Sequence, residues 1–372
     1  MNCVKIGFLL IITIVFFEPG SFAQKRKTVV TIKGEDFYIN GKITLKGINY
    51  QGIRLEGLLP NSRMVQGIFD DYNPETKNTW AYPDTKKWDA DRNTNEFIKG
   101  MPQWKAQGLL AFTLNLQGGS PTGYGNQQPC INSAFAADGS LDKKYMVRLE
   151  KILNKADELG MVVILGYFYF GQDQQLKDEQ AVITATQNAT NWVMDKGYRN
   201  VLIELNNECD INNLNSSSNS PYNHAILDVK RVHELINLVK NNNKKGKSLL
   251  VSTSFKGGAV PTENVLAVAD FVLIHGNGVT KPEAISEMIK KLRASPAYKQ
   301  NPIVINEDDH FDFDKPFNHL IAATKEHVSW GYFDYRMKDE GYEDGYQSMP
   351  VDWSINSKRK KAFFELLKKM VN

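Results

Sequence analysis

Cysteine is scarce in this sequence, and that scarcity excludes several classes of protein. The 372 residues contain three cysteines, and Cys3 precedes an apolar N-terminal run, which leaves Cys130 and Cys209 in the rest of the chain. Two cysteines cannot form the disulfide framework of a small secreted scaffold, although a single bridge between them stays open. The sequence also has no CxxC and no HExxH motif, so the common zinc and redox signatures are absent and we predict no cofactor.

Charge of one sign is also lacking. Lysine and arginine number 45 against 42 aspartates and glutamates, a formal net charge of +3, and the lysines are scattered over helical stretches. Nucleic-acid-binding proteins concentrate basic residues in a patch or stripe, so we do not expect nucleic acid as a partner. The sequence gives no indication of oligomeric state.

The N-terminus has the pattern of an export signal. Lys5 precedes the apolar run IGFLLIITIVFF, and Ser21-Phe22-Ala23 places small residues at the cleavage-site positions. The run is too short to span a membrane comfortably. We therefore predict a signal peptide over residues 1–23, cleaved near Ala23, and a mature chain over residues 24–372 that is secreted or periplasmic and not held in the membrane.

Apolar runs and helical patterns alternate along the mature chain. A predicted small hairpin comes first, with Asn40-Gly41 as its turn. Strand-like runs follow at residues 43–50, 109–116, 161–168, 200–206, 248–254, 271–274, 302–306 and 330–334, and helix-period segments separate them. Continuous apolar strands are typical of buried parallel sheets, and eight strand–helix repeats favour a (β/α)8 barrel of the α/β class as a single catalytic domain.

Two glutamates stand where predicted strands end. Glu208 comes just after the fourth run, NVLIELN, and Glu307 follows the seventh, PIVIN. Barrel enzymes build their active sites at the carboxyl ends of the strands, and strands four and seven face each other across the barrel. A facing pair of carboxylates suits cleavage of a glycosidic bond, because one can protonate the leaving oxygen while the other attacks the sugar or activates water.

The same residues resemble a known family. The entry FYINGKITLKGINY, the Asn207-Glu208 pair, Glu307 and the aromatic Trp330 are similar to the clan A, cellulase-like retaining glycoside hydrolases of (β/α)8 fold. The resemblance implies that Glu208 is the acid/base, that Asn207 binds the sugar 2-hydroxyl and that Glu307 is the nucleophile. The sequence departs from the family in having no arginine near the end of the second predicted strand, and an asparagine where His-x-Tyr would place tyrosine after His275.

The other predicted strand exits supply candidate substrate-binding residues. His275 is expected to orient Glu307, and the remaining candidates at strand exits are Tyr50, Asn115, Tyr167 and Trp330. The long excursion over residues 51–91 adds aromatic side chains, Trp80 among them, that could stack on sugar rings or anchor the loop to the barrel.

The run Glu307-Asp308-Asp309-His310 admits a divalent metal site as an alternative, together with His275. Adjacent side chains on a strand point to opposite faces, which argues against that alternative.

The sequence thus predicts a secreted retaining glycosidase that cleaves a β-linked oligo- or polysaccharide with Glu208 and Glu307. The alternative is a non-catalytic carbohydrate-binding barrel. Sugar, linkage and endo or exo action stay open.

Overall fold

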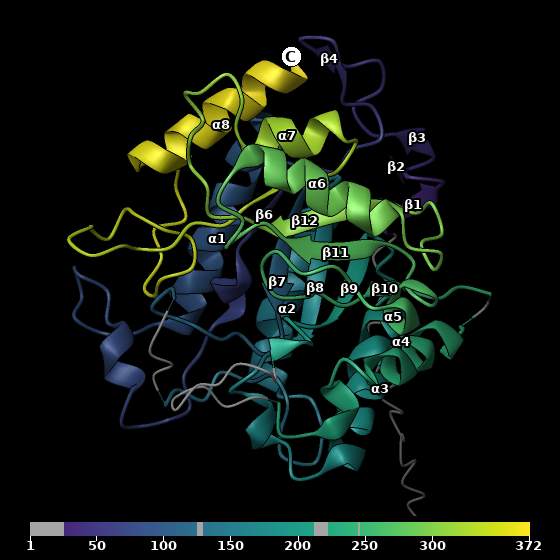
Figure 1. Ribbon diagram of the computed structural model, residues 1–372. Helices are drawn as coiled ribbons and strands as arrows, with labels where there is room; N and C mark the ends of the chain where they lie inside the picture. Colours follow the sequence, from purple (N-terminus) through teal and green to yellow (C-terminus); the bar gives the residue numbers. More distant parts are fainter. Residues whose placement is uncertain (1–25, 125–128, 212–221, 245) are drawn as a thin grey trace, which may run out of the picture.

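The computed structural model describes residues 26–124, 129–211, 222–244 and 246–372 (Figure 1). The predicted signal peptide, residues 1–23, lies outside the described residues. None of the helices found in the described part of the chain has the length and apolar character needed to cross a membrane.

The predicted (β/α)8 barrel is confirmed. In the described residues, parallel ladders join β10-β9-β8-β7-β6-β13 and β11-β12, and bridges from Val304 to Ser329 and from Asp308 to Tyr332 connect β12 to β13. The amide of Asp270, just before β11, donates to Val251 of β10 at 3.0 Å, so the ring of strands is nearly closed. The barrel strands are β6 (Asn61–Arg63), β7 (Ala111–Asn115), β8 (Val162–Phe168), β9 (Val201–Asn206), β10 (Leu250–Ser252), β11 (Val272–His275), β12 (Ile303–Glu307) and β13 (Gly331–Tyr332).

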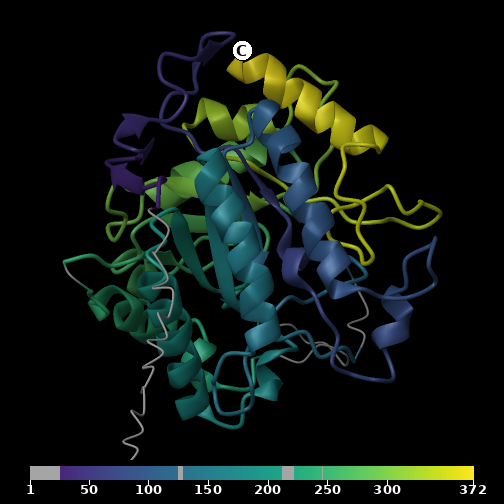
Figure 2. The ribbon, with the colours of Figure 1, turned by 180° about the vertical axis from the view of Figure 1, so that it is seen from behind.

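Amphipathic helices surround the strands, as Figures 1 and 2 show from opposite sides. Local sequence sets their ends: Asp142 caps the start of α2 by accepting from the amides of Lys144 and Tyr145, and Gly160 ends it with a left-handed φ of 67°. The helices in the described residues are α1 (Ala90–Ala106), α2 (Lys143–Leu159), α3 (Glu179–Asp195), α4 (Val232–Asn241), α5 (Glu263–Leu266), α6 (Pro282–Arg293), α7 (His319–Lys325) and α8 (Lys358–Val371).

A small antiparallel sheet closes the amino-terminal end of the barrel. Strands β1 (Val30–Lys33), β2 (Asp36–Ile39) and β3 (Lys42–Ile43) form it, and the predicted Asn40-Gly41 turn joins β2 to β3 with positive φ at both residues. Val30 and Phe37 from this sheet pack in one apolar cluster with residues of the barrel strands, such as Ala111 and Leu202. The hairpin therefore covers the end of the barrel away from the predicted site.

The prediction for the first barrel strand is wrong. Residues 43–50 do not enter the barrel; β4 (Asn49–Tyr50) instead pairs with β5 (Ile53–Arg54) in a separate hairpin. The first barrel strand is β6, whose residues Asn61, Ser62 and Arg63 are all polar and all buried. An apolar run could not reveal it, because its side chains face polar partners inside the sheet.

The barrel interior has two layers of different chemistry. Apolar side chains fill the amino-terminal layer, whereas polar side chains occupy the layer nearer the carboxyl ends of the strands. On β9, for example, the inward face changes from Leu202 to Glu204, both fully buried. Buried polar groups are costly unless they are paired, so this polar layer indicates a functional end of the barrel.

Candidate active site

Glu208 and Glu307 come together at the carboxyl ends of their strands. Glu208 follows β9, and Glu307 is the last residue of β12. One oxygen of each carboxylate and one ring nitrogen of His275, the last residue of β11, lie within 4.8 Å of one another. All three residues are buried, with 8%, 5% and 0% of their surface exposed. The two carboxylates thus face one small volume at the end of the barrel.

The chain makes a strained turn at Glu208. Its φ of 51° is left-handed, a conformation that costs free energy in a residue with a side chain. The Glu208 amide donates to the Ser254 hydroxyl at 2.9 Å, which holds this turn against the loop after β10. The His275 ring nitrogen Nδ1 lies 3.0 Å from Glu208 Oε1, within hydrogen-bonding distance. Contacts from Ser254 and His275 therefore hold Glu208 in this strained conformation, in which its carboxylate lies near that of Glu307.

Glu307 is held by cationic and amide donors. Arg63 Nε lies 2.7 Å from Glu307 Oε2, and Asn277 Nδ2 donates to Oε1 at 2.8 Å. His275 Nδ1 lies 3.6 Å from Oε2, so the histidine is nearer to Glu208 than to the residue that we expected it to orient.

Burial and charge act in opposite directions on this cluster. Burial raises the pKa of Glu307, and the Arg63 guanidinium and His275 oppose that rise. Burial alone would lower the pKa of His275, but the Glu307 and Glu208 carboxylates raise it above its usual value. The site is therefore a compact, buried set of coupled charges of the kind that enzymes use for proton transfer.

Arg63 is a site residue that sequence analysis missed. It ends β6, is 1% exposed, and its Nη2 donates to Asn207 Oδ1 at 2.7 Å as well as pairing with Glu307. The family resemblance implies an arginine near the end of the second predicted strand. In the structure Arg63 comes from the first barrel strand, β6. The available signal was an arginine inside the short polar segment Asn61–Arg63. If such an arginine is buried it needs a charged partner, and that need points to a carboxylate of the site.

A second missed group lies beside Glu307. The Asn277 amide also hydrogen bonds the Tyr124 hydroxyl, and the Tyr124 ring packs edge-on against Phe333 and Tyr335 at centroid distances of 5.4 and 4.7 Å. Tyr124 is 45% exposed. An exposed aromatic ring thus stands one side chain away from Glu307, at a position where a sugar ring could stack.

Four predicted substrate-binding aromatics lie elsewhere. Tyr50 is on the β4–β5 hairpin, and the Tyr167 hydroxyl hydrogen bonds Thr190 of α3, outside the barrel. Trp80 is 1% exposed and donates to Asp71, and Trp330 packs against Phe363 of α8. Alternation along a strand divides the side chains between two faces, but it does not say which face points into the barrel. These aromatics were therefore assigned to the wrong face or the wrong segment.

Two of the other predicted residues lie inside the barrel. Asn207 contacts Arg63 as described, and Asn115 is buried on β7 with its amide against Gly166 of β8. A methyl group at Gly166 would lie 2.2 Å from Asn115 Oδ1, so the glycine makes room for this amide.

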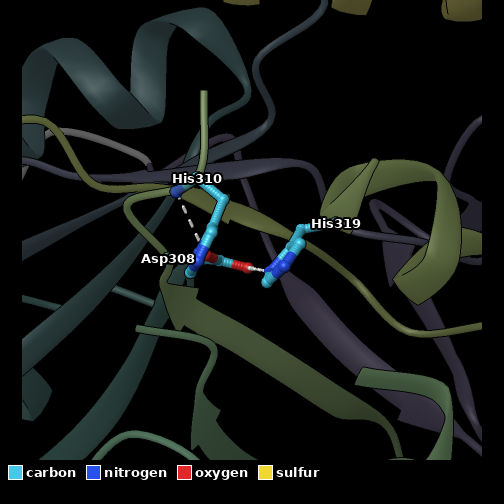
Figure 3. Close-up of side chains that lie close together, drawn as sticks. All are labelled: Asp308, His310 and His319. Atoms are coloured by element: carbon cyan, nitrogen blue, oxygen red, sulfur yellow. Dashed lines mark hydrogen bonds and ion pairs between the residues drawn. The ribbon is translucent and has the colours of Figure 1, made fainter. Parts of the chain in front are cut away.

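Asp308 and its neighbours form a separate cluster outside the barrel (Figure 3). His310 Nδ1 lies 2.7 Å from Asp308 Oδ1, while His319 Nδ1 and Trp330 Nε1 lie 3.0 and 2.8 Å from Oδ2. The alternative metal site thus separates into two groups, because Glu307 and Asp308 point to opposite faces of β12.

Each of these groups could offer three ligand atoms to a cation, as judged in the described part of the chain. Arg63 opposes a cation beside Glu307. In the second group, hydrogen bonds from two histidines and a tryptophan already satisfy the Asp308 carboxylate. Hydrogen bonding therefore accounts for both arrangements without a metal ion.

Cys130 and Cys209 are free, buried thiols. Cys209 directly follows Glu208, and burial raises the pKa of its thiol. The bridge that the sequence left open does not form in this structure.

Several solved structures of similar fold are described as glycoside hydrolases. An endo-1,4-beta-mannanase from Rhizomucor miehei matches with a TM-score of 0.56 and 10% identity, over 92% of this chain and 99% of that one. A GH5-4 broad specificity endoglucanase from Clostridium acetobutylicum matches with a TM-score of 0.53 and 11% identity, over 85% and 97%. A family 5 lichenase from Caldicellulosiruptor sp. F32, in complex with cellotetraose, matches with a TM-score of 0.51 and 12% identity, over 89% and 100%.

Sequence comparison is less informative. Neither a protein-family model nor a curated protein matches the sequence. The chain spans 60% of the length of one Bacteroides vulgatus protein of similar structure, at 12% identity. At identities this low the similarity confirms the (β/α)8 fold alone, and the function has to be argued from the site.

Proposed function

We propose that this protein is an exported glycoside hydrolase that cleaves a β-linked glycan with retention of configuration. The observation that carries the proposal is the approach of Glu208 and Glu307, whose nearest oxygens fall within 4.8 Å at the carboxyl ends of β9 and β12. Retaining glycosidases have carboxyl groups about 5–5.5 Å apart, whereas inverting enzymes leave about 6.5–9.5 Å for a water molecule. A short separation supports direct attack by one carboxylate.

The surroundings of the two glutamates support different roles. Burial raises the pKa of Glu307, but its contacts with the permanently charged Arg63 and with the Asn277 amide oppose that rise and favour the ionised form that a nucleophile needs. Among the described residues, the ion-pair partner of Glu208 is His275 and not an arginine, so its surroundings differ from those of Glu307 and suit the acid/base role.

The proposed reaction has two steps. In the first, Glu307 attacks the anomeric carbon while Glu208 gives its proton to the departing glycosidic oxygen, which yields a glycosyl ester on Glu307 and the released alcohol. In the second, Glu208 takes a proton from water, the resulting hydroxide adds to the anomeric carbon, and Glu307 leaves as a carboxylate. Two inversions at one carbon give net retention.

Two observations support the proposed substrate class: the aromatic side chains near Glu307 and the activities named for proteins of similar structure. The exposed Tyr124 ring, packed against the buried Phe333 and the half-buried Tyr335, offers an aromatic face near Glu307 that suits the C–H face of a sugar. The structural neighbours described as endoglucanase and mannanase direct the choice toward plant-type β-glucans and β-mannans as first substrates. Export, predicted from residues 1–23, would bring the enzyme to such polymers.

A hydrolysis screen tests the proposal against a carbohydrate-binding barrel without activity. The mature chain from Gln24 and its variants Glu208→Gln, Glu307→Gln and Glu365→Gln would be incubated with β-glucans, β-mannans, xylans and aryl β-glycosides. Glu365 is an exposed residue of α8 and serves as the control. We expect turnover by the wild type and the control, and loss of at least about 10³-fold in the site variants. Equal activity in all four proteins, or an α-configured first product in the NMR spectrum, would overturn the proposal.

A further inference from the structure

A third carboxylate lies beneath the two proposed catalytic glutamates. Glu204 is on β9, the strand that leads to Glu208, and none of its surface is exposed. Its register partners are Gly166 of β8 and Ser252 of β10, neither of which carries a charge. A fully buried glutamate is rare unless it is paired, so its partners indicate what it is for.

Glu204 and Glu307 share one arginine. Glu204 Oε2 lies 3.7 Å from Arg63 Nη1, while Glu307 Oε2 lies 2.7 Å from Arg63 Nε. Asn306 Nδ2 donates to the same Glu204 oxygen at 3.3 Å, and Glu204 Oε1 has no hydrogen-bond partner in the described part of the chain. Arg63 Nη1 has no hydrogen-bond partner in the described part of the chain, so Glu204 holds this end of the guanidinium by charge alone, while Nε meets Glu307.

The charges of this cluster do not balance without protons. Among the described residues, Glu204 interacts electrostatically with Arg63, Glu307 and Tyr222. Glu307 in turn interacts with His275 and Glu208, and the Tyr169 hydroxyl lies close to Arg63. Three carboxylates meet one permanent cation and one histidine. If all three were ionised and His275 were protonated, a net negative charge would remain in a buried site, which is unfavourable. The described cluster therefore holds more acidic groups than cationic partners.

We propose that Glu204 is a positioning residue that keeps Arg63 in place beside Glu307 and, through its buried negative charge, sets the pH range in which the catalytic pair works. Glu204 acts only through Arg63 and through its charge, since it does not reach the space between the two catalytic carboxylates. Its negative charge raises the pKa of Glu307, whereas Arg63 lowers it. This inference rests on the proposed glycosidase function and adds a residue to it.

The test is the pH dependence of kcat/KM on an aryl β-glycoside, for two variants of opposite charge effect. Glu204→Gln removes the charge, so both limbs of the profile should move to lower pH, the alkaline limb by about one unit. Asn306→Asp adds a negative charge beside Glu204 and should move the limbs to higher pH. Thr113→Val, a buried change without charge on β7, is the control, with limbs expected at the wild-type positions.

The outcomes separate the inference from the function on which it rests. Opposite shifts in the two variants support the role of Glu204. Limbs at the wild-type pH in either variant that folds would overturn it and leave Glu204 as a structural residue, even if both variants are less stable. A wild type without activity, or full activity in Glu307→Gln, would instead show that the proposed function itself is wrong.

Discussion

Replacement of Arg63 by methionine should damage both stability and activity in a pH-dependent way. The change keeps most of the side-chain volume but removes the guanidinium that contacts Glu307 at 2.7 Å, Asn207 at 2.7 Å and Glu204 at 3.7 Å. Removing one partner of a buried ion pair costs about 3–5 kcal/mol, and an unsatisfied buried acceptor costs about 1–3 kcal/mol. We expect a loss of about 4 kcal/mol at pH 8, since proton uptake by the carboxylates relieves part of the sum.

The loss should be smaller in acid, and the sign follows from linkage. Without Arg63, the pKa of Glu307 in the folded state rises further above its unfolded value. A group with a raised folded pKa contributes stability that is present below the unfolded pKa and is lost as the pH rises through the folded pKa. The deficit of Arg63→Met relative to wild type should therefore fall to about half between pH 8 and pH 5.

Urea unfolding followed by tryptophan fluorescence at pH 5 and pH 8 measures the stability, and kcat/KM against pH measures the site. The acidic limb of the profile should move up by about two units, so activity at a pH on the acidic limb of both profiles should fall about 100-fold. Arg148→Met is the matched control, because Arg148 is also a buried arginine but pairs with Asp70, 3.5 Å away and apart from the catalytic pair. Equal deficits at both pH values, or the same shift of the limb in Arg148→Met, would refute this reasoning.

Three further changes test other parts of the structure. Asn277→Ala removes a donor to Glu307, so kcat should fall about tenfold with little change in KM; a change in KM alone would mean that Asn277 contacts substrate instead. Asp308→Asn leaves His310, His319 and Trp330 with one fewer acceptor, so urea unfolding should show a loss of about 2 kcal/mol, and unchanged stability would contradict the hydrogen bonding in Figure 3. N-terminal sequencing of protein from the native host should begin at or near Gln24, and a soluble chain that starts at Met1 would disprove export.

Much of the barrel was predictable because parallel strands buried on both faces are continuous apolar runs. Strands β7 to β13 all fall within or next to the predicted runs. Glu208 lies just after the end of β9 and Glu307 is the last residue of β12, so both could be predicted from the ends of these runs. Strand β6 was not predictable in this way. Its three polar residues are stabilised by partners that are distant in sequence, such as Glu307 for Arg63 and the Tyr332 carbonyl for Ser62.

The lining of the site was harder to predict than its two glutamates. Tyr124 comes from the loop after β7, and no periodic pattern places a loop residue beside Glu307. Trp330 and Tyr167 show the converse error, because each sits near a strand end yet packs against the helices outside the barrel. Strand alternation fixes which residues share a face, but only tertiary packing decides which face is inside.

Azide rescue of the two alanine variants tests the assignment of Glu208 and Glu307 most directly, with an aryl β-glycoside that the wild type hydrolyses. Glu208→Ala should still form the glycosyl ester, because an activated phenol leaves without a proton, and azide should then accelerate the second step to give a β-glycosyl azide. Glu307→Ala should give no such product, because no ester forms. Rescue of Glu307→Ala in place of Glu208→Ala would reverse the roles, and wild-type turnover by both variants without azide would contradict the catalytic pair altogether.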